Sequence, residues 1–217
     1  RAAGTIPASS RGILISGGNN VILDNVKSAR SDSCFYVSGG LSIRFNRVFT
    51  QACATDHLVL DSVPEVYIQN SRFGTNGAGD LSATDYIKIT GTDPNTLFVT
   101  QTQFNQGGGA NVLYWLNFVS ATQTNGIYRF TNDYVETVSS ALIKSDAGQS
   151  TILRLGIVNS LFNATGASVF ALNAATQPVE WEISASEFFC ADMTLAPTAA
   201  ISKVSITSTN IGCQSSF

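Results

Sequence analysis

One short pattern recurs along this chain about every 22 to 29 residues, roughly eight times, from Gly12 onward. Each copy has an apolar triplet, a small polar turn, and a second alternating strand that ends in Asn, Ser or Thr. An aromatic or aliphatic residue follows, and a loop of variable length closes the copy. The first copies read GILISGGNNVILDNVKS, CFYVSGGLSIRFNRVFTQ and DHLVLDSVPEVYIQNSRFG. A period of roughly 20 to 50 residues is the signature of a solenoid, in which similar units stack along one axis.

Apolar side chains within each copy fall at every second position, as at Val66 and Ile68, which indicates strands and not helices. The best helix candidate, residues 139–146, is short and begins within a copy. A unit of about 25 residues cannot bury its own apolar face, but stacked units cover one another at the strand spacing of about 4.8 Å. One inward ladder is then expected to contain Ile15, Val37, Leu60, Ile89 and Leu116.

An asparagine follows the second strand in three consecutive copies. We expect Asn25, Asn46 and Asn70 at the same place in successive coils. Asparagine suits a tight turn because its side chain bonds its own backbone and tolerates the left-handed region. Stacked asparagine side chains would also bond one another along the solenoid axis.

The segment Val66-Tyr67-Ile68-Gln69-Asn70-Ser71-Arg72-Phe73 follows the pattern V-x-I-x-N-(x)2-F/V. It resembles the second strand, asparagine turn and third strand of the pectin-lyase-like architecture, and the resemblance covers residues 12–211. The resemblance implies an all-β fold, a right-handed parallel β-helix solenoid of about eight coils. Residues 1–11 would be a lead-in, and residues 12–217 a single β-helix domain of a longer chain. The alternative is a β-sandwich or up-and-down barrel, with strands at a spacing of about 8 to 12 residues.

Composition excludes some partners. Charged residues make up 12% of the chain and the net charge is −3, and without a basic stripe no nucleic-acid partner is expected. No apolar run reaches the roughly 18 residues of a membrane span, so no membrane insertion is expected. Ser, Thr, Asn and Gln carry the polarity, a tendency of extracellular and virion β-proteins. Met193 is the only methionine, which favours a processed form or a fragment.

The four cysteines predict one disulfide more clearly than a second. Cys190 and Cys213 are 23 residues apart, the same offset as between Ile183 and Ile206, so they would stack in adjacent coils. Their Cα atoms would then lie about 5 Å apart, within the range of a disulfide; two buried free thiols are the alternative. Cys34 and Cys53 lie in neighbouring turns but out of register, which makes their pairing less secure.

No metal or cofactor is expected. The chain has no C-x-x-C motif and one histidine, His57, which does not suffice for a structural zinc site. His57 lies at a strand start without a recognisable nucleophilic partner, so we expect it to have a structural role.

Paired carboxylates are the catalytic device that a β-helix acting on glycans would use. The catalytic candidates lie in or beside the expected long turns: Asp80 and Asp85 flank one turn, and Asp133 and Glu136 lie in the turn two coils later. Stacked turns would bring acids of different coils to the roughly 5 to 9 Å separation of glycoside hydrolysis. The alternative is that these acids merely solvate loops. The characteristic polygalacturonase motifs and the aspartate column of calcium-dependent pectate lyases are missing.

Residues that alternate with the inward ladder on the first strand should face outward. Tyr36, Lys88 and Trp115 are such residues, and Tyr86 lies close by. A line of Tyr, Lys and Trp along a groove would stack on sugar faces and bond sugar hydroxyls, so these four residues are the substrate-binding candidates. The run 112–119 is apolar at nearly every position, so its phase is ambiguous. Under the other phase Trp115 lies in the core, and the run could also meet another subunit.

An uncharged, Asn/Ser/Thr-rich β-helix is most similar to bacteriophage tailspikes and related receptor-binding appendages. That resemblance implies a homotrimer, located in the virion tail or otherwise outside the cell, that binds or cleaves bacterial surface polysaccharide. As an enzyme, the chain would be a glycoside hydrolase or a polysaccharide lyase. Two alternatives stay open: a secreted polysaccharide hydrolase or lyase of a cell, and a structural or adhesive solenoid without catalysis.

Overall fold

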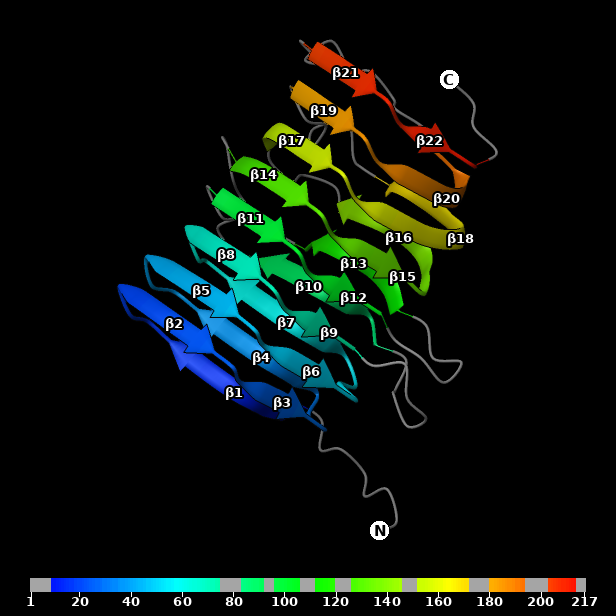
Figure 1. The fold of residues 1–217 in the computed structure, drawn as a ribbon. Helices are drawn as coiled ribbons and strands as arrows, with labels where there is room; N and C mark the ends of the chain where they lie inside the picture. Colours follow the sequence, from blue (N-terminus) through cyan, green and yellow to red (C-terminus); the bar gives the residue numbers. More distant parts are fainter. Residues whose placement is uncertain are drawn as a thin grey trace.

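The computed structural model describes residues 9–74, 83–91, 96–105, 112–119, 126–145, 152–171, 180–193 and 203–213. Every regular element within these ranges is a β-strand. The chain passes through a first, a second and a third strand and then begins the next coil (Figure 1). Each of the first six coils therefore extends the sheets by one strand in each position, and β19 to β22 add further second and third strands.

The first strands are β1 (Arg11–Ser16), β4 (Ser33–Ser38), β7 (Asp56–Asp61), β10 (Asp85–Thr90), β13 (Val112–Phe118) and β16 (Val138–Ser145). The second strands are β2 (Asn20–Asp24), β5 (Ser42–Asn46), β8 (Glu65–Gln69), β11 (Thr96–Thr100), β14 (Gly126–Thr131), β17 (Ile152–Val158), β19 (Glu180–Ser184) and β21 (Lys203–Thr207). The third strands are β3 (Lys27–Ala29), β6 (Phe49–Gln51), β9 (Arg72–Phe73), β12 (Gln103–Phe104), β15 (Tyr134–Glu136), β18 (Leu161–Ala171), β20 (Glu187–Asp192) and β22 (Asn210–Ile211).

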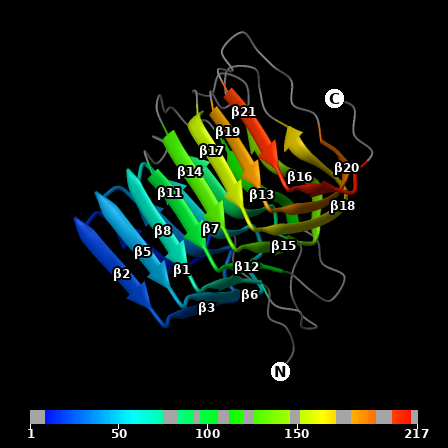
Figure 2. The ribbon, with the colours of Figure 1, turned by 45° about the horizontal axis from the view of Figure 1, so that its top comes forward.

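Strands of successive coils pair in parallel. The second strands form an eight-stranded sheet in the order β2-β5-β8-β11-β14-β17-β19-β21, which Figure 2 shows as one regular row. The first and third strands belong to a 14-stranded sheet, in which the long β18 pairs with both β15 and β16. The prediction of an all-β parallel solenoid is confirmed. Strands β1 to β18 make about six turns and β19 to β22 continue the sheets, a minor difference from the eight coils predicted.

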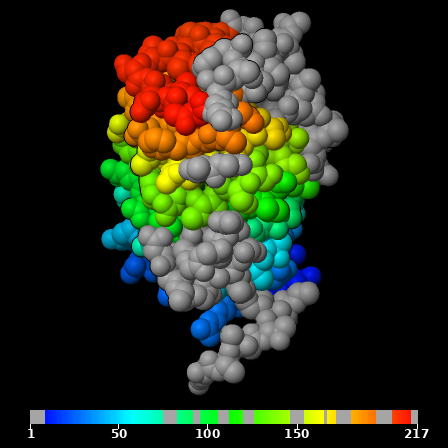
Figure 3. Space-filling model, turned by 90° about the vertical axis from the view of Figure 1, so that its right-hand side faces the viewer, coloured from blue at the N-terminus to red at the C-terminus, as the bar shows by residue number. Residues whose placement is uncertain are grey.

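The coils follow one another along the long axis of the molecule, so colours that mark chain order appear as successive bands in the space-filling view (Figure 3). Side chains from all three strand positions meet inside this stack. Aromatic rings run along it: Phe73 stacks on Phe104 with centroids 5.1 Å apart, and Phe162 stacks on Phe188 at 4.8 Å. This continuous column of buried rings replaces the single compact core of a globular domain.

The predicted inward ladder is right in four coils and shifted in the fifth. Ile15, Val37, Leu60 and Ile89 lie in one register, but the next member is Phe118 and not Leu116. Leu116 instead aligns with Ile87. Because a shift of two residues returns a side chain to the same face of a strand, Leu116 is still fully buried.

A column of left-handed residues forms the turn after the second strands. Asn25 and Asn70 belong to it, with φ of 56° and 51°. The prediction that Asn46 shares this place is wrong by one residue, because Arg47 has the left-handed φ of 54° while Asn46 still pairs with Asp24 as the last residue of β5. The amide of Asn70 nevertheless donates to Asn46 Oδ1 at 3.5 Å, since neighbouring side chains reach along the axis.

From Asn70 onward, the residue after the left-handed position of the turn forms a second, buried column of side-chain oxygens, most of them hydroxyl groups. Ser160 shows the pattern: its Oγ donates to the Val158 carbonyl at 3.0 Å and accepts the backbone N–H of Asp133 at 3.1 Å. We call the members of this column the hydroxyl ladder: Ser71, Thr102, Asp133, Ser160 and Ser186. It satisfies backbone groups that a turn would otherwise leave unpaired inside the protein.

Two disulfides join neighbouring parts of the stack. Cys190 is joined to Cys213, the pair that the repeat offset aligns, with Cα atoms 4.6 Å apart. A second disulfide joins Cys34 to Cys53, a pair that the sequence register did not favour, with Cα atoms 5.5 Å apart. The residues that the structure describes include no helix long and apolar enough to cross a membrane.

Candidate functional site

The outer face of the first strands is the predicted groove. Tyr36 aligns with Val59 and Val59 with Lys88, so these residues share one outward column as predicted. The next member is Asn117, which takes the place predicted for Trp115. Val59 and Asn117 are buried, so the tyrosine and the lysine are the two of these four residues that reach the surface, and Trp115 is not in the column.

The prediction that Trp115 faces outward is wrong. Its side chain is fully buried, with its ring centroid 4.4 Å from that of Phe130. Tyr86 is also fully buried, 5.1 Å from the ring of His57, and its hydroxyl donates to the Glu136 carbonyl at 3.2 Å. Two successive residues are buried at this place in the first strands, since Ile87 is buried next to Tyr86 and Leu116 next to Trp115. Neither ring can stack on a sugar from outside.

Tyr36 lies at the surface in a network of its own. Its hydroxyl donates to Asp61 Oδ2 at 3.2 Å, and the guanidinium of Arg11 lies 3.8 Å from the ring centroid. Burial, followed by the charge of Asp61, raises the pKa of the Tyr36 hydroxyl. One face of the Tyr36 ring is therefore already occupied by a cation.

Two aspartates stack at the start of the first strands. Asp56 and Asp85 are partners in adjacent coils, and both are buried. Ser33 Oγ donates to Asp56 Oδ2 at 3.4 Å, and Asn117 Nδ2 donates to Asp85 Oδ1 at 2.9 Å. The ammonium group of Lys88 lies 3.7 Å from Asp56 Oδ2. We call Asp56 and Asp85 the aspartate pair.

The aspartate pair holds a proton at neutral pH. Burial, and then the charge of Asp56, raises the pKa of Asp85 to about 8. Burial also raises the pKa of Asp56, against the opposing effect of Lys88. Two carboxylates in contact cannot both ionise easily in a buried place. A shared proton would also serve Asp56 Oδ1 and Asp85 Oδ2, which have no other hydrogen-bond partner.

The two other predicted acids that the structure describes, Asp133 and Glu136, bond groups other than Asp85. Asp133 is a member of the hydroxyl ladder, and its carboxylate accepts the backbone N–H groups of Thr102 at 2.9 Å and Thr131 at 3.0 Å. Burial raises its pKa to about 7, although both N–H groups favour the ionised form. Glu136 accepts a hydrogen bond from the Tyr134 hydroxyl. Asp80 lies outside the described residues.

The part of the chain that the structure describes contains no cluster of three or more His, Cys, Asp or Glu side chains that could hold a metal ion. His57 is buried, and its Nδ1 lies 2.7 Å from Thr50 Oγ1. The ionisable groups of the first strands are thus engaged with one another and with neighbouring polar groups.

The outer face of the eight-stranded sheet carries a row of side chains that the sequence reasoning missed. Arg44, Tyr67, Phe98 and Arg129 occupy one register position on four consecutive strands, β5, β8, β11 and β14. The Arg44 guanidinium lies 5.0 Å from the Tyr67 ring centroid, and the Tyr67 and Phe98 rings meet edge to face at 5.8 Å. We call these four residues the aromatic–arginine row.

The row borders a shallow hollow. Phe98 is 38% exposed, which is unusual for a phenylalanine on a regular sheet. The hollow has a volume of about 240 Å³, and the side chains that line its polar parts are Gln69, Thr100, Thr131 and Arg129. Amide, hydroxyl and guanidinium groups around one exposed and one half-buried ring are a combination suited to sugars.

The sequence contained the signal for this row. In the strands S-I-R-F-N, E-V-Y-I-Q, T-L-F-V-T and I-Y-R-F-T, the flanking apolar residues are inward, so the residue between them must face outward. The resemblance to pectin-lyase-like proteins instead predicts the substrate groove on the first strands.

Two further hollows lie on the outer surface. One, of about 460 Å³, lies beside the turn after the second strands and is lined by Arg47, Phe49, Asn70, Arg72, Gln101 and Gln103. Lys27 lies 4.8 Å from the Phe49 ring centroid, so the outward side of this ring is also occupied by a cation.

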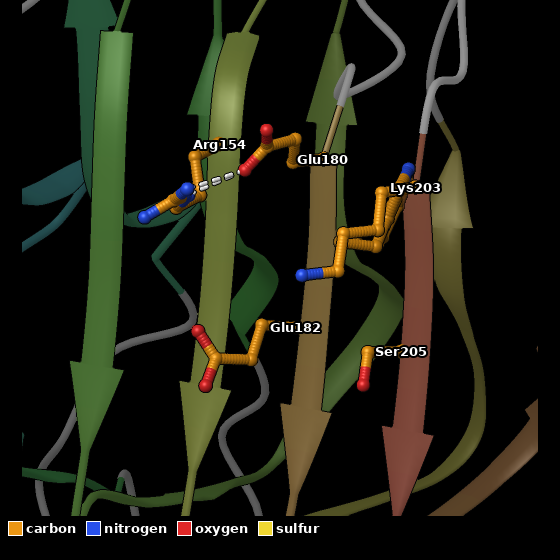
Figure 4. A pocket seen from close by; sticks show the side chains of 6 residues that line it. Arg154, Glu180, Glu182, Lys203 and Ser205 are labelled. Carbon is orange, nitrogen blue, oxygen red and sulfur yellow. Dashed lines mark hydrogen bonds and ion pairs between the residues drawn. The ribbon is translucent and has the colours of Figure 1, made fainter.

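The other hollow, of about 170 Å³, lies near the C-terminal end of the eight-stranded sheet (Figure 4). Arg154, Glu180 and Lys203 follow one another on β17, β19 and β21, and Arg154 Nη2 lies 2.5 Å from Glu180 Oε2. Alternating charges neutralise one another there, which leaves little for a ligand to bind.

No known protein family, no curated protein and no solved structure matches this chain. The geometry of the strands and their outward side chains therefore carries the functional argument.

Proposed function

We propose that this solenoid binds bacterial surface polysaccharide in the manner of a phage tailspike, with the aromatic–arginine row as its contact surface. The observation that carries the proposal is the Tyr67–Phe98 ring pair on the outer face of the eight-stranded sheet, in which Phe98 is 38% exposed and Tyr67 is half-buried. A soluble protein keeps such a pair at its surface at a free-energy cost, which a ligand can offset by covering the rings.

The physical match is between two periodic objects. Parallel strands place equivalent side chains at intervals of about 4.8 Å along the axis, and a polysaccharide presents equivalent sugar faces along its length. Aromatic rings stack on the apolar faces of sugars, while amide and hydroxyl groups bond the sugar hydroxyls. A rigid solenoid does not need to order a loop on binding, which removes one entropic cost.

Cleavage of the polysaccharide is a second candidate function, favoured by the aspartate pair. A carboxylic acid with a pKa of about 8, as at Asp85, stays protonated at neutral pH and can donate to a leaving group. Asp85 is fully buried in the structure, however, so this function requires the site to open to substrate. Binding needs no such rearrangement, and we place it first.

The homotrimer and the place outside the cell belong to the same proposal. The two disulfides support it, because disulfides persist mainly in oxidising compartments. Light scattering tests the oligomeric state: we expect three times the 23.0 kDa of the chain, and a monomer would remove the homotrimer from the proposal.

Calorimetric titration with a panel of capsular and lipopolysaccharide glycans tests the binding surface. We expect Tyr67→Ala and Phe98→Ala each to weaken binding by about 1 kcal/mol or more, roughly fivefold. Ile127→Ala is the matched control, because Ile127 lies on β14 of the same sheet and is also 38% exposed. Equal losses in all three variants, or no loss in the first two, would contradict the proposal.

A further inference from the structure

We infer that the aromatic–arginine row selects acidic polysaccharides, whose carboxylate or other anionic groups bind Arg44 and Arg129 at the two ends of the ring pair. This inference rests on the proposed function and adds the chemical class of the ligand. It is based on which arginines of the eight-stranded sheet and its border form an ion pair within the protein and which do not.

The arginines of this surface fall into two kinds. Arg47 Nη2 lies 2.5 Å from Asp24 Oδ2, and Arg154 Nη2 lies 2.5 Å from Glu180 Oε2, so these two are neutralised by the protein. Arg44 and Arg129 have no ion pair with any described residue. Both unpaired guanidinium groups border the exposed rings, which is where a ligand would lie.

The two free arginines are also held in place. The Arg44 guanidinium rests against the Tyr67 ring at 5.0 Å. Arg129 pairs in register with Gly156 on the next strand, and a Cβ at Gly156 would lie 3.6 Å from Arg129 Cγ, so the arginine stem lies close over the backbone there. A preorganised guanidinium loses less entropy when it binds an anion.

The spacing suits a polymer and not a single small ion. Arg44 and Arg129 are three strand intervals apart, which is about 14 Å along the axis. One small anion cannot span that distance, whereas a glycan with repeated acidic groups can contact both guanidinium groups and both rings. Binding at two linked points also raises the affinity above that of either point alone.

Acidic side chains of the protein do not occupy the hollow. Its lining contains no Asp or Glu. Three exposed carboxylates lie near the row in the sheet: Glu65, two residues before Tyr67 on β8, Glu182, which follows Gly156 in the column, and Asp24 on β2, which is paired with Arg47. Because the chain has a net charge of −3, an acidic polymer would be repelled over most of the surface and drawn to this row.

The test uses matched pairs of bacterial polysaccharides: each acidic glycan in its native form, and the same glycan after its carboxylates have been reduced to alcohols. We expect the native acidic form to bind at least tenfold more tightly than the reduced form at 50 mM salt, and this difference to shrink at 300 mM because salt screens the charges.

Variants assign the effect to residues. Arg44→Gln and Arg129→Gln should each lower affinity for the acidic glycan about fivefold or more and reduce its salt dependence, while affinity for reduced glycan changes little. Arg154→Gln is the control, since it removes a guanidinium that the protein already neutralises. Thermal unfolding checks that all variants are folded.

The outcomes separate the inference from the proposed function. Equal binding of native and reduced glycans, with no effect of Arg44→Gln or Arg129→Gln, overturns the acidic selectivity and leaves glycan binding intact. No binding to any glycan in either form overturns both.

Discussion

Asp133 shows how one position can serve the fold with unusual chemistry. The other members of the hydroxyl ladder are serine or threonine, and each donates to a carbonyl two residues earlier, as Ser71 does to Gln69. Asp133 instead accepts two backbone N–H groups with its carboxylate. Its position identifies it as a turn residue, although its sequence context suggested a catalytic pair with Glu136.

Substitution of Asp133 should therefore change stability. We expect Asp133→Ser to remain within about 1 kcal/mol of the wild type, because serine restores the ladder, and Asp133→Leu to lose about 1–3 kcal/mol, because it leaves buried N–H groups unpaired. Urea unfolding measures both. A large loss in Asp133→Ser together with tolerance of Asp133→Leu would contradict this role.

The buried acids also set a pH dependence. The pKa of Asp85 is raised to about 8 and that of Asp133 to about 7, from an ordinary value of 3.8. Between the ordinary value of 3.8 and the raised values of about 7 and 8, the folded state binds more protons than the unfolded state. The raised pKa values therefore stabilise the fold fully below pH 3.8, and this stabilisation is lost as the pH rises through 7 to 8.

We expect the free energy of unfolding to fall by at least about 1.4 kcal/mol between pH 5 and pH 8, the equivalent of one pKa unit. Asp85→Asn should flatten this dependence. Asp24→Asn is the control, because Asp24 is exposed and its pKa is lowered by Arg47. Denaturant unfolding at a series of pH values gives the curve, and stability that rises over this range would contradict the protonation states.

The strands gain their stability from the ring columns inside the stack. Phe104 touches three other rings, those of Phe73, Tyr86 and Trp115. Its strand, β12, has two residues, so local hydrogen bonding alone cannot hold it in place. The packing of one large buried side chain per coil thus stabilises a short third strand more than the few backbone hydrogen bonds of that strand.

Phe104 and Phe98 form a natural comparison, since one is fully buried and the other is 38% exposed. We expect Phe104→Ala to lower the free energy of unfolding by about 3–5 kcal/mol. Phe98→Ala should lower it by less than about 1 kcal/mol, because its ring lies at the surface and its removal leaves no cavity in the core. Thermal or denaturant unfolding checks both, and similar losses in the two variants would count against this division.

At the element scale, the strands themselves were predictable, but the places where two successive residues are buried were not. The alternation that includes Val66 and Ile68 predicts one inward face of the strand, and both side chains are indeed buried. The first strands break that alternation, since Tyr86 and Ile87 are both buried. A run such as 112–119, apolar at nearly every position, contains no signal that would place this break in the alternation, and the prediction put Trp115 on the wrong side of the strand.

At the scale of the whole molecule, the repeat is sufficient to predict the fold because each coil contacts only its neighbours. A parallel solenoid follows from its period, and errors of one or two residues, as at Asn46 and Leu116, change little in the stack. Function is different, because it depends on which outward column gathers compatible side chains. Alternation in the sequence places each member of the aromatic–arginine row on the outer face, but the register of four strands is needed to bring the four into one column.

The central claim is that a glycan lies on this row, and hydroxyl-radical footprinting with and without bound polysaccharide tests it most directly. We expect the glycan to protect Tyr67 and Phe98 from oxidation while Tyr36, on the outer face of the first strands, remains as reactive as before. Protection of Tyr36 with Tyr67 and Phe98 unchanged would place the ligand on the first strands and contradict the account.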